Sequence, residues 1–307
     1  MSKSTSGPLG FSVGQWRLFM VVLVVGLSLT TFQIFRRQGL SDTAALYIGL
    51  PLLLALAMSL SPKSQSTIGA TMKGLTIALL LSVPVFMEGF ICVLFASPIL
   101  YSIAALTAWC ADRLKKRRDG RSTLQFSVIA SVLFVASLEG TPYELISFDD
   151  HYEVTYSDVV TGSVDSIKGK LAAFAFSANH RPAFLKVFPY PESVSSEGLE
   201  AGDEISVRFV YKKWFIANAH SGTTVFRVVE SNDNIIRFEI PTDDSYLSHY
   251  LDWQASEVSF SPVNEAETRV AWTLSFRRKL DPAWYFGPLQ RYAAWLAAQV
   301  LVSNVAA

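Results

Sequence analysis

Few side chains in this sequence have the types and spacing that chemistry requires. The aspartate pairs Asp149-Asp150 and Asp243-Asp244 lack the spaced oxygen ligands of a calcium loop. No histidine has a second histidine or a cysteine at metal-ligand spacing; the histidines are His151, His180, His220 and His249. No nucleophile elbow, phosphate-binding loop or dinucleotide motif occurs. We therefore predict no catalytic residue, metal site or cofactor, while an enzyme that uses a single acid or tyrosine in a cavity stays open.

One carboxylate, Glu88, interrupts an otherwise uncharged apolar stretch over residues 74–111. A charge at the centre of a bilayer is costly. The stretch is also too long for one crossing, because a helix rises about 1.5 Å per residue and the hydrocarbon core is about 30 Å thick. A turn at Glu88 would give two spans and place the carboxylate at the water surface. A buried proton or ion site is the alternative, although the stretch offers no second ionisable residue to pair with it.

The first 140 residues have the composition of a membrane region. Half of the whole chain is apolar and only 17% of it is charged, against about 25% in soluble domains. Every apolar block long enough to cross a bilayer lies in this part. We predict a multi-span region over residues 1–140, with spans at about 18–35, 43–60, 72–87, 90–111 and 123–138. The protein is therefore expected to be an integral, multi-pass protein of the cell membrane, with membrane lipid as a partner.

Charge sets the expected orientation of these spans. The loop over residues 113–121 is dense in Lys and Arg, which marks the cytoplasmic side. Residues 139–165 contain several acids and no Lys or Arg, so the domain that follows should be extracytoplasmic. The same orientation follows if the stretch over residues 74–111 crosses only once. The zero formal net charge gives no reason to expect a nucleic-acid partner.

From about His151 the hydrophobic pattern changes to the alternation of half-buried strands. The segment "EVTYSDVV" predicts a strand and "DSIKGKLAAFAF" a short helix. "EISVRFVY" predicts a further strand, and two antiparallel pairs follow: "TTVFRVVES" with "NIIRFEI", and "SEVSFSPV" with "TRVAWTLSFRR". The last segment, "DPAWYFGPLQRYAAWLAAQVLVSNVAA", predicts a long helix packed on the sheet, with a sixth span as the alternative. We expect an α+β domain over residues 150–307.

This order of elements resembles the SRPBCC superfamily, the START-like or polyketide cyclase and lipid-transport domains. The resemblance is carried by "FPYPESVSSEGLEAGDEISVRFVY" (188–211) and "ETRVAWTLSFRRKLDPAWYFGPLQRYAAWL" (267–296). "MEGFICVLFASPI" (87–99) also resembles the membrane portion of membrane-attached members. The resemblance implies a helix-grip fold, in which a curved antiparallel sheet surrounds a long C-terminal helix. It also implies a cavity for a hydrophobic small molecule or lipid. The first strand departs from the family by lacking the usual proline before the first helix.

Aromatic residues on the strands and one stripe of the last helix are the candidates to line such a cavity. For any single one of them ordinary core packing is favoured over ligand contact, because burying one such side chain contributes about 1.5–3 kcal/mol. Which face of each strand points inward is also undecided, because a register slip of one residue reverses the two faces. The candidates are Phe209, Tyr211, Phe226, Phe238, Phe260, Trp272, Phe276, Tyr285, Leu289 and Tyr292.

Three functions therefore remain open from the sequence. The leading one is an integral membrane protein whose START-like domain binds a hydrophobic ligand, with a lipid as the first candidate. The second is a partner-binding or sensory membrane protein whose helix-grip domain has a closed core. The third is a cyclase or hydrolase acting inside the cavity. The sequence identifies no protein partner.

Overall fold

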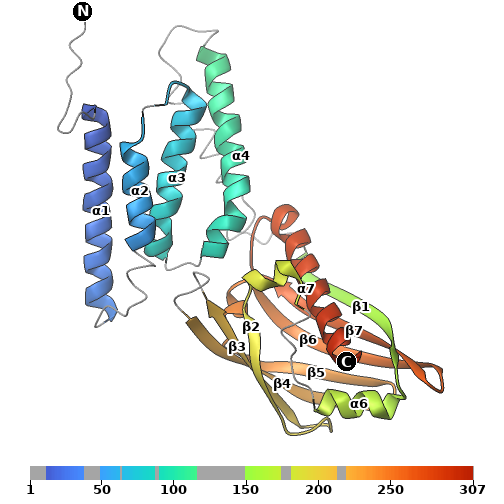
Figure 1. The fold of residues 1–307 in the computed structure, drawn as a ribbon. Helices are drawn as coiled ribbons and strands as arrows, with labels where there is room; N and C mark the ends of the chain where they lie inside the picture. Colours follow the sequence, from blue (N-terminus) through green and yellow to red (C-terminus); the bar gives the residue numbers. More distant parts are fainter. Residues whose placement is uncertain are drawn as a thin grey trace, which may run out of the picture. The chain divides into compact units, whose positions relative to one another are not determined.

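The computed structural model describes residues 12–37, 49–62, 64–86, 90–115, 149–173, 181–212 and 219–306. They form two units, one helical and one built on a β-sheet, and each is treated by itself. Figure 1 shows the elements of both.

The described residues of the first unit form four helices. They are α1 (Val13–Arg37), α2 (Leu50–Leu60), α3 (Thr67–Phe86) and α4 (Phe90–Lys115). The apolar stretch over residues 74–111 is thus divided between α3 and α4. Glu88 and the predicted fifth span, residues 123–138, lie outside the described residues.

Polar contacts tie these helices together at their ends. The side-chain amide of Gln15 donates to the carbonyls of Leu60 and Ser61 (2.9 and 2.8 Å), and Lys73 Nζ donates to that of Ser61 (2.9 Å). Within the described residues, one helical stretch, Val93–Arg113, is long and apolar enough to cross a bilayer, and three shorter helical stretches are apolar. Membrane crossing by these helices stays a prediction.

The second unit is a curved sheet of seven antiparallel strands in the order β1-β7-β6-β5-β4-β3-β2. The sheet curves around α7 (Ala283–Ala306), which packs on β1 and β7 (Figure 1). This arrangement is the predicted helix grip. The strands are β1 (His151–Thr161), β2 (Tyr190–Ser196), β3 (Glu204–Lys212), β4 (Ala219–Ser231), β5 (Ile235–Asp243), β6 (Leu251–Asn264) and β7 (Glu267–Arg278). Helix α6 (Val164–Ala172) and the 3-10 helices η5 (Ala183–Val187) and η6 (Tyr246–His249) connect them.

The helix α7 turns small residues toward the sheet. Its buried positions include Gly287, Ala294 and Ala298, and a Cβ on Gly287 would lie 2.7 Å from the hydroxyl oxygen of Tyr152 on β1. Such residues let the helix approach the strands closely. Tyr292, which we expected on the buried face, is instead 50% exposed. The expectation failed because the buried stripe runs instead through Gly287, Ala294 and Val302, on another side of the helix.

One end of the concave face, beneath the last turns of α7, is a closed hydrophobic core. Trp272 is 5% exposed, and its indole N–H donates to Ser256 Oγ at 2.8 Å, so its polar atom is satisfied. We call this region the packed end; its buried members are Val160, Ile167, Leu171, Val228, Ile236, Phe238, Val258, Phe260, Val270, Trp272, Leu274, Ala298, Val302 and Val305.

Candidate ligand site

The opposite end of the concave face lies where β5 runs into η6, and we call it the η6 end. Its strand residues can be placed from the register of β3 and β4. Ile205 pairs with Phe226, and both pack against the core of the packed end. Alternate strand residues share a face, so three further pairs also line the concave side. These are Val207 with Thr224, Phe209 with Gly222, and Tyr211 with His220.

Tyr246 of η6 is the centre of an aromatic cluster at this end. Its ring stacks on Tyr211 (centroids 4.5 Å apart) and on His249 (4.6 Å), and lies 5.7 Å from His220 and from Tyr250. Tyr211, Tyr246 and Tyr250 are buried, whereas the two histidines are exposed. The cluster therefore runs from the interior to the surface of the domain.

A group of polar side chains from β4 and the end of β5 lies beside these rings. We call it the polar floor; its members are Thr224, Asp243 and Ser245. Asp243 Oδ1 accepts hydrogen bonds from Thr224 Oγ1 (2.7 Å) and from the backbone N–H of Ser245 (2.9 Å). Asp243 Oδ2 and Ser245 Oγ are buried and have no hydrogen-bond partner among the described residues. A buried polar atom without a partner costs about 1–3 kcal/mol, and native proteins rarely leave one without a reason. Asp243 ends β5 and Ser245 precedes the first turn of η6, so the two atoms lie two residues apart along the chain.

The helix α7 adds a third atom of the same kind. The side-chain amide of Gln290 donates to the carbonyl of Tyr250 at 2.7 Å, which fixes the helix against the end of η6. Gln290 Oε1 is buried and also lacks a partner among the described residues.

The close approach of two backbone segments positions the floor. Gly222 of β4 lies so near the carbonyl of Asp244 that a Cβ would overlap it. Register shifts between β4 and β5, one of them between Val225 and Arg227, reverse the side-chain alternation. Asp243 consequently reaches the same face as Thr224.

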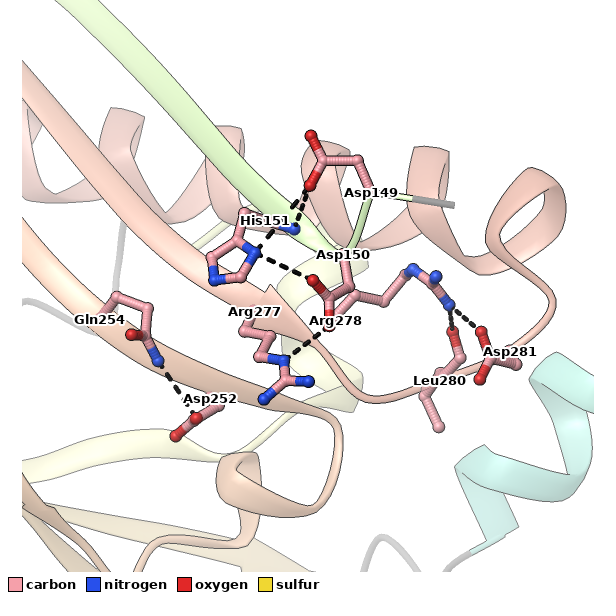
Figure 2. Close-up of polar contacts among 9 residues, drawn as sticks. All are labelled: Asp149, Asp150, His151, Asp252, Gln254, Arg277, Arg278, Leu280 and Asp281. Atoms are coloured by element: carbon pink, nitrogen blue, oxygen red, sulfur yellow. Dashed lines mark hydrogen bonds and ion pairs between the residues drawn. The ribbon is translucent and has the colours of Figure 1, made fainter. Parts of the chain in front are cut away.

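A second polar cluster lies at the edge where β1 meets β7 (Figure 2). Asp149, Asp150 and His151 could together offer three ligand atoms to a metal ion. Both oxygens of Asp150 already have partners, however: Oδ2 is 2.6 Å from Arg277 Nε and Oδ1 is 2.9 Å from His151 Nδ1. The hydrogen bond from Arg277 lowers the pKa of Asp150. We interpret this cluster as a clamp that joins β1 to β7.

An ion pair between a buried arginine and an exposed aspartate follows the clamp at the end of β7. Arg278 is buried, and its guanidinium donates to the carbonyl of Leu280 and to the carboxylate of Asp281 (Figure 2). The pair closes the turn that leads from the sheet into α7.

The structure divides the predicted cavity residues among different places. Phe226, Phe238, Phe260 and Trp272 meet in the packed end, and Phe276 packs with Leu251 and Ala294 in a smaller cluster. Phe209 and Tyr211 belong to the η6 end. Tyr285 and Leu289 are half-buried on α7, and Tyr292 is exposed.

Sequence reasoning missed most residues of the η6 end. Thr224, Asp243, Ser245 and Tyr246 were not among the candidates. The last three lie in "PTDDSYLSH" (241–249), from the end of β5 through η6, whose composition is typical of a polar loop. The available signal was the close spacing of Tyr246, His249 and Tyr250 in "YLSHY", which could have indicated an aromatic cluster.

Comparison with known proteins found similarity to solved structures only. No family model and no curated protein matches the sequence. A START superfamily protein from Mycobacterium smegmatis is 16% identical, with 50% of this chain and 93% of that one covered at a TM-score of 0.32. The Zhui aromatase/cyclase from a Streptomyces species is 11% identical, with coverages of 50% and 93% and a TM-score of 0.32. Norcoclaurine synthase from Thalictrum flavum is 16% identical, with coverages of 49% and 94% and a TM-score of 0.29. The helix-grip arrangement rests on the strand order and α7 described above.

Proposed function

We propose that the sheet domain binds a hydrophobic ligand at the η6 end of its concave face, with a lipid as the first candidate. The observation that carries this proposal is the polar floor beside the rings. Asp243 Oδ2 and Ser245 Oγ are buried without a partner, next to the stacked rings of Tyr211 and Tyr246. An apolar ligand body would pack on those rings, and a donor group on the ligand would satisfy the floor.

The energetics favour a ligand that has both features. Binding sites for small molecules are mostly apolar, with a few polar groups that fix orientation. Satisfying one buried acceptor recovers part of its cost of about 1–3 kcal/mol. A ligand with an apolar body and a hydroxyl, amine or amide headgroup therefore fits better than a pure hydrocarbon.

We further propose that the helical unit crosses a membrane and so anchors the sheet domain to it. The sheet domain would lie on the extracytoplasmic side, and the basic loop over residues 113–121 in the cytoplasm. Several large apolar side chains of α1, α2 and α4 are exposed on that unit, among them Val21, Leu53 and Leu106. Such a surface suits lipid better than water. A bilayer would also supply a lipid ligand directly.

Identification of retained molecules tests the binding proposal. The full chain would be purified in mild detergent, extracted with organic solvent, and its retained molecules compared by mass spectrometry with those of two variants. Ser245→Ala changes the polar floor, and Ser256→Ala makes the same substitution at the packed end. We expect a molecule that is present in wild type and Ser256→Ala but depleted at least several-fold in Ser245→Ala.

Two outcomes would overturn the proposal. Identical extracts from all three proteins would mean that annular lipid alone is retained, which favours the partner-binding function. A converted product released on incubation with candidate lipids would favour the enzyme function.

A further inference from the structure

The outer face of α7 differs from that of an ordinary surface helix. Among the described residues of the sheet domain, the exposed large aromatic side chains are Trp284 (65% exposed), Tyr292 (50%) and Trp295 (37%), all on this helix. They fall at helical spacing along one side. The distance from the first to the last is about 16 Å at 1.5 Å rise per residue. We call these three residues the aromatic ridge.

Neighbouring rings hold part of the ridge in place. Phe184 of η5 contacts Tyr292 edge-on (centroids 5.2 Å apart), and Tyr292 stacks on Trp295 at 6.4 Å. Trp295 in turn meets Tyr156 of β1 at 5.4 Å. Tyr292 and Trp295 are therefore held by rings of η5 and β1, while all three residues of the ridge keep exposed surface.

Both signs of charge lie near the ridge, but α7 and η5 themselves contribute only positive charge. Tyr156, which meets Trp295, donates a hydrogen bond to the exposed Asp158 of β1 at 3.3 Å. Neither η5 (Ala183–Val187) nor α7 (Ala283–Ala306) contains an aspartate or glutamate. Their cations, Lys186 and Arg291, are exposed, and the guanidinium of Arg291 lies 5.4 Å from the ring centre of Tyr152. A helix that faces water normally carries both signs of charge on its outer side. This one carries aromatic rings flanked by positive charge.

We propose that the aromatic ridge docks on the surface of an anionic lipid bilayer. Trp and Tyr are the residues that concentrate at membrane interfaces, because their rings are apolar and their polar edges remain hydrated. Lys and Arg beside them gain about 1 kcal/mol each near an anionic leaflet. Docking would hold the domain flat against the membrane, independently of whether the concave face binds a ligand.

Lipid quenching of a fluorescent probe tests this docking on the full chain. In a Cys92→Ser, Cys110→Ser background, Tyr292→Cys places a probe on the ridge. Val263→Cys is the matched control, because Val263 is equally exposed (51%) but lies on the hairpin between β6 and β7. Each protein is reconstituted in phosphatidylcholine vesicles with or without phosphatidylglycerol, and the quencher is a nitroxide at the headgroup level. We expect several-fold stronger quenching at position 292 than at 263, and a rise at 292 when phosphatidylglycerol is present.

Other results would overturn the proposal. Equal quenching at the two positions would show that the ridge does not meet the bilayer. Energy transfer between probes at position 292 on different copies, with no lipid quenching, would identify a second copy as the occupant. The charge argument has its own test in Arg291→Glu, which should reduce quenching at position 292 only in the vesicles with phosphatidylglycerol. Unchanged quenching at position 292 in those vesicles would show that Arg291 does not contribute to docking through its charge.

Discussion

The two ends of the concave face are formed by the same sheet and the same helix, yet they differ in whether their buried polar atoms have hydrogen-bond partners. At the packed end the indole of Trp272 has its partner in Ser256, and the surrounding side chains are apolar and buried. At the η6 end Asp243, Ser245 and Gln290 each bury an oxygen without a partner among the described residues. This difference is the reason for proposing the η6 end, and not the packed end, as the ligand site.

The largest expected effect comes from opening the packed end. Trp272→Ala should lower the free energy of unfolding by about 3–5 kcal/mol, because it leaves a cavity in a closed core and removes the partner of Ser256. Urea unfolding of the full chain, followed by the near-ultraviolet signal of the domain, measures this. Trp284→Ala is the control, because Trp284 is 65% exposed on α7, and it should cost less than about 1 kcal/mol. Similar losses for both variants would mean that the packed end is not a closed core.

Gly222→Ala should have the next largest effect, at the η6 end. Its Cβ would overlap the backbone carbonyl of Asp244, and such crowding costs about 1–3 kcal/mol. The displacement of η6 should also reduce ligand retention. Gly169→Ala on α6 is the control, because its Cβ meets nothing within 4 Å, and it should stabilise the domain by about 0.5–1 kcal/mol. Retention that is unaffected by Gly222→Ala would separate the ligand from the η6 end.

Paired serine substitutions sharpen the comparison most. Ser256→Ala should cost about 1 kcal/mol by removing a hydrogen bond, with no effect on the retained ligand. Ser245→Ala removes a buried hydroxyl oxygen that has no partner, so the free energy of unfolding should stay the same or rise slightly while ligand retention falls. Thermal unfolding and mass spectrometry on both variants measure the two quantities. A loss of stability in Ser245→Ala without a change in retention would reverse the assignment.

Much of the fold followed from the sequence, because alternation and turn residues are local signals. Six of the seven strands and the terminal helix were predicted in order; β2 was not, because its segment is interrupted by a proline and rich in serine. Phe238, Phe260 and Trp272 do share one buried cluster, against which Phe226 packs. The η6 end did not follow. Simple alternation from Phe238 would put Asp243 on the outer face, and only the register shifts between β4 and β5 bring it to the concave side.

The buried face of α7 was misread for a different reason. Hydrophobic periodicity weights bulky residues, so Tyr292 was placed inside. The contact between α7 and β1 instead depends on small residues such as Gly287 and Ala294. How closely a helix approaches a sheet is set by both partners, and sequence periodicity describes only one of them.

The smallest expected effect concerns polar groups that already have partners. Arg277 lowers the folded-state pKa of Asp150 below its ordinary value. The ion pair therefore contributes stability above the unfolded-state pKa of about 3.9, and this contribution is lost as pH falls through the folded-state pKa. Asp150→Asn should lower the melting temperature slightly at neutral pH and match wild type in strong acid. A rise in the wild-type melting temperature with calcium, absent in the variant, would instead make this cluster a metal site.

Photocrosslinking tests most directly whether the η6 end holds the ligand. The photoreactive residue p-benzoylphenylalanine would replace Phe209 at the η6 end or Phe260 at the packed end, two phenylalanines on the same concave face. After irradiation in membranes, the intact mass of the full chain reports any adduct. We predict a small-molecule adduct at position 209 and none at position 260. An adduct at 260 but not at 209, or none at either position, would contradict the assignment of the ligand to the η6 end.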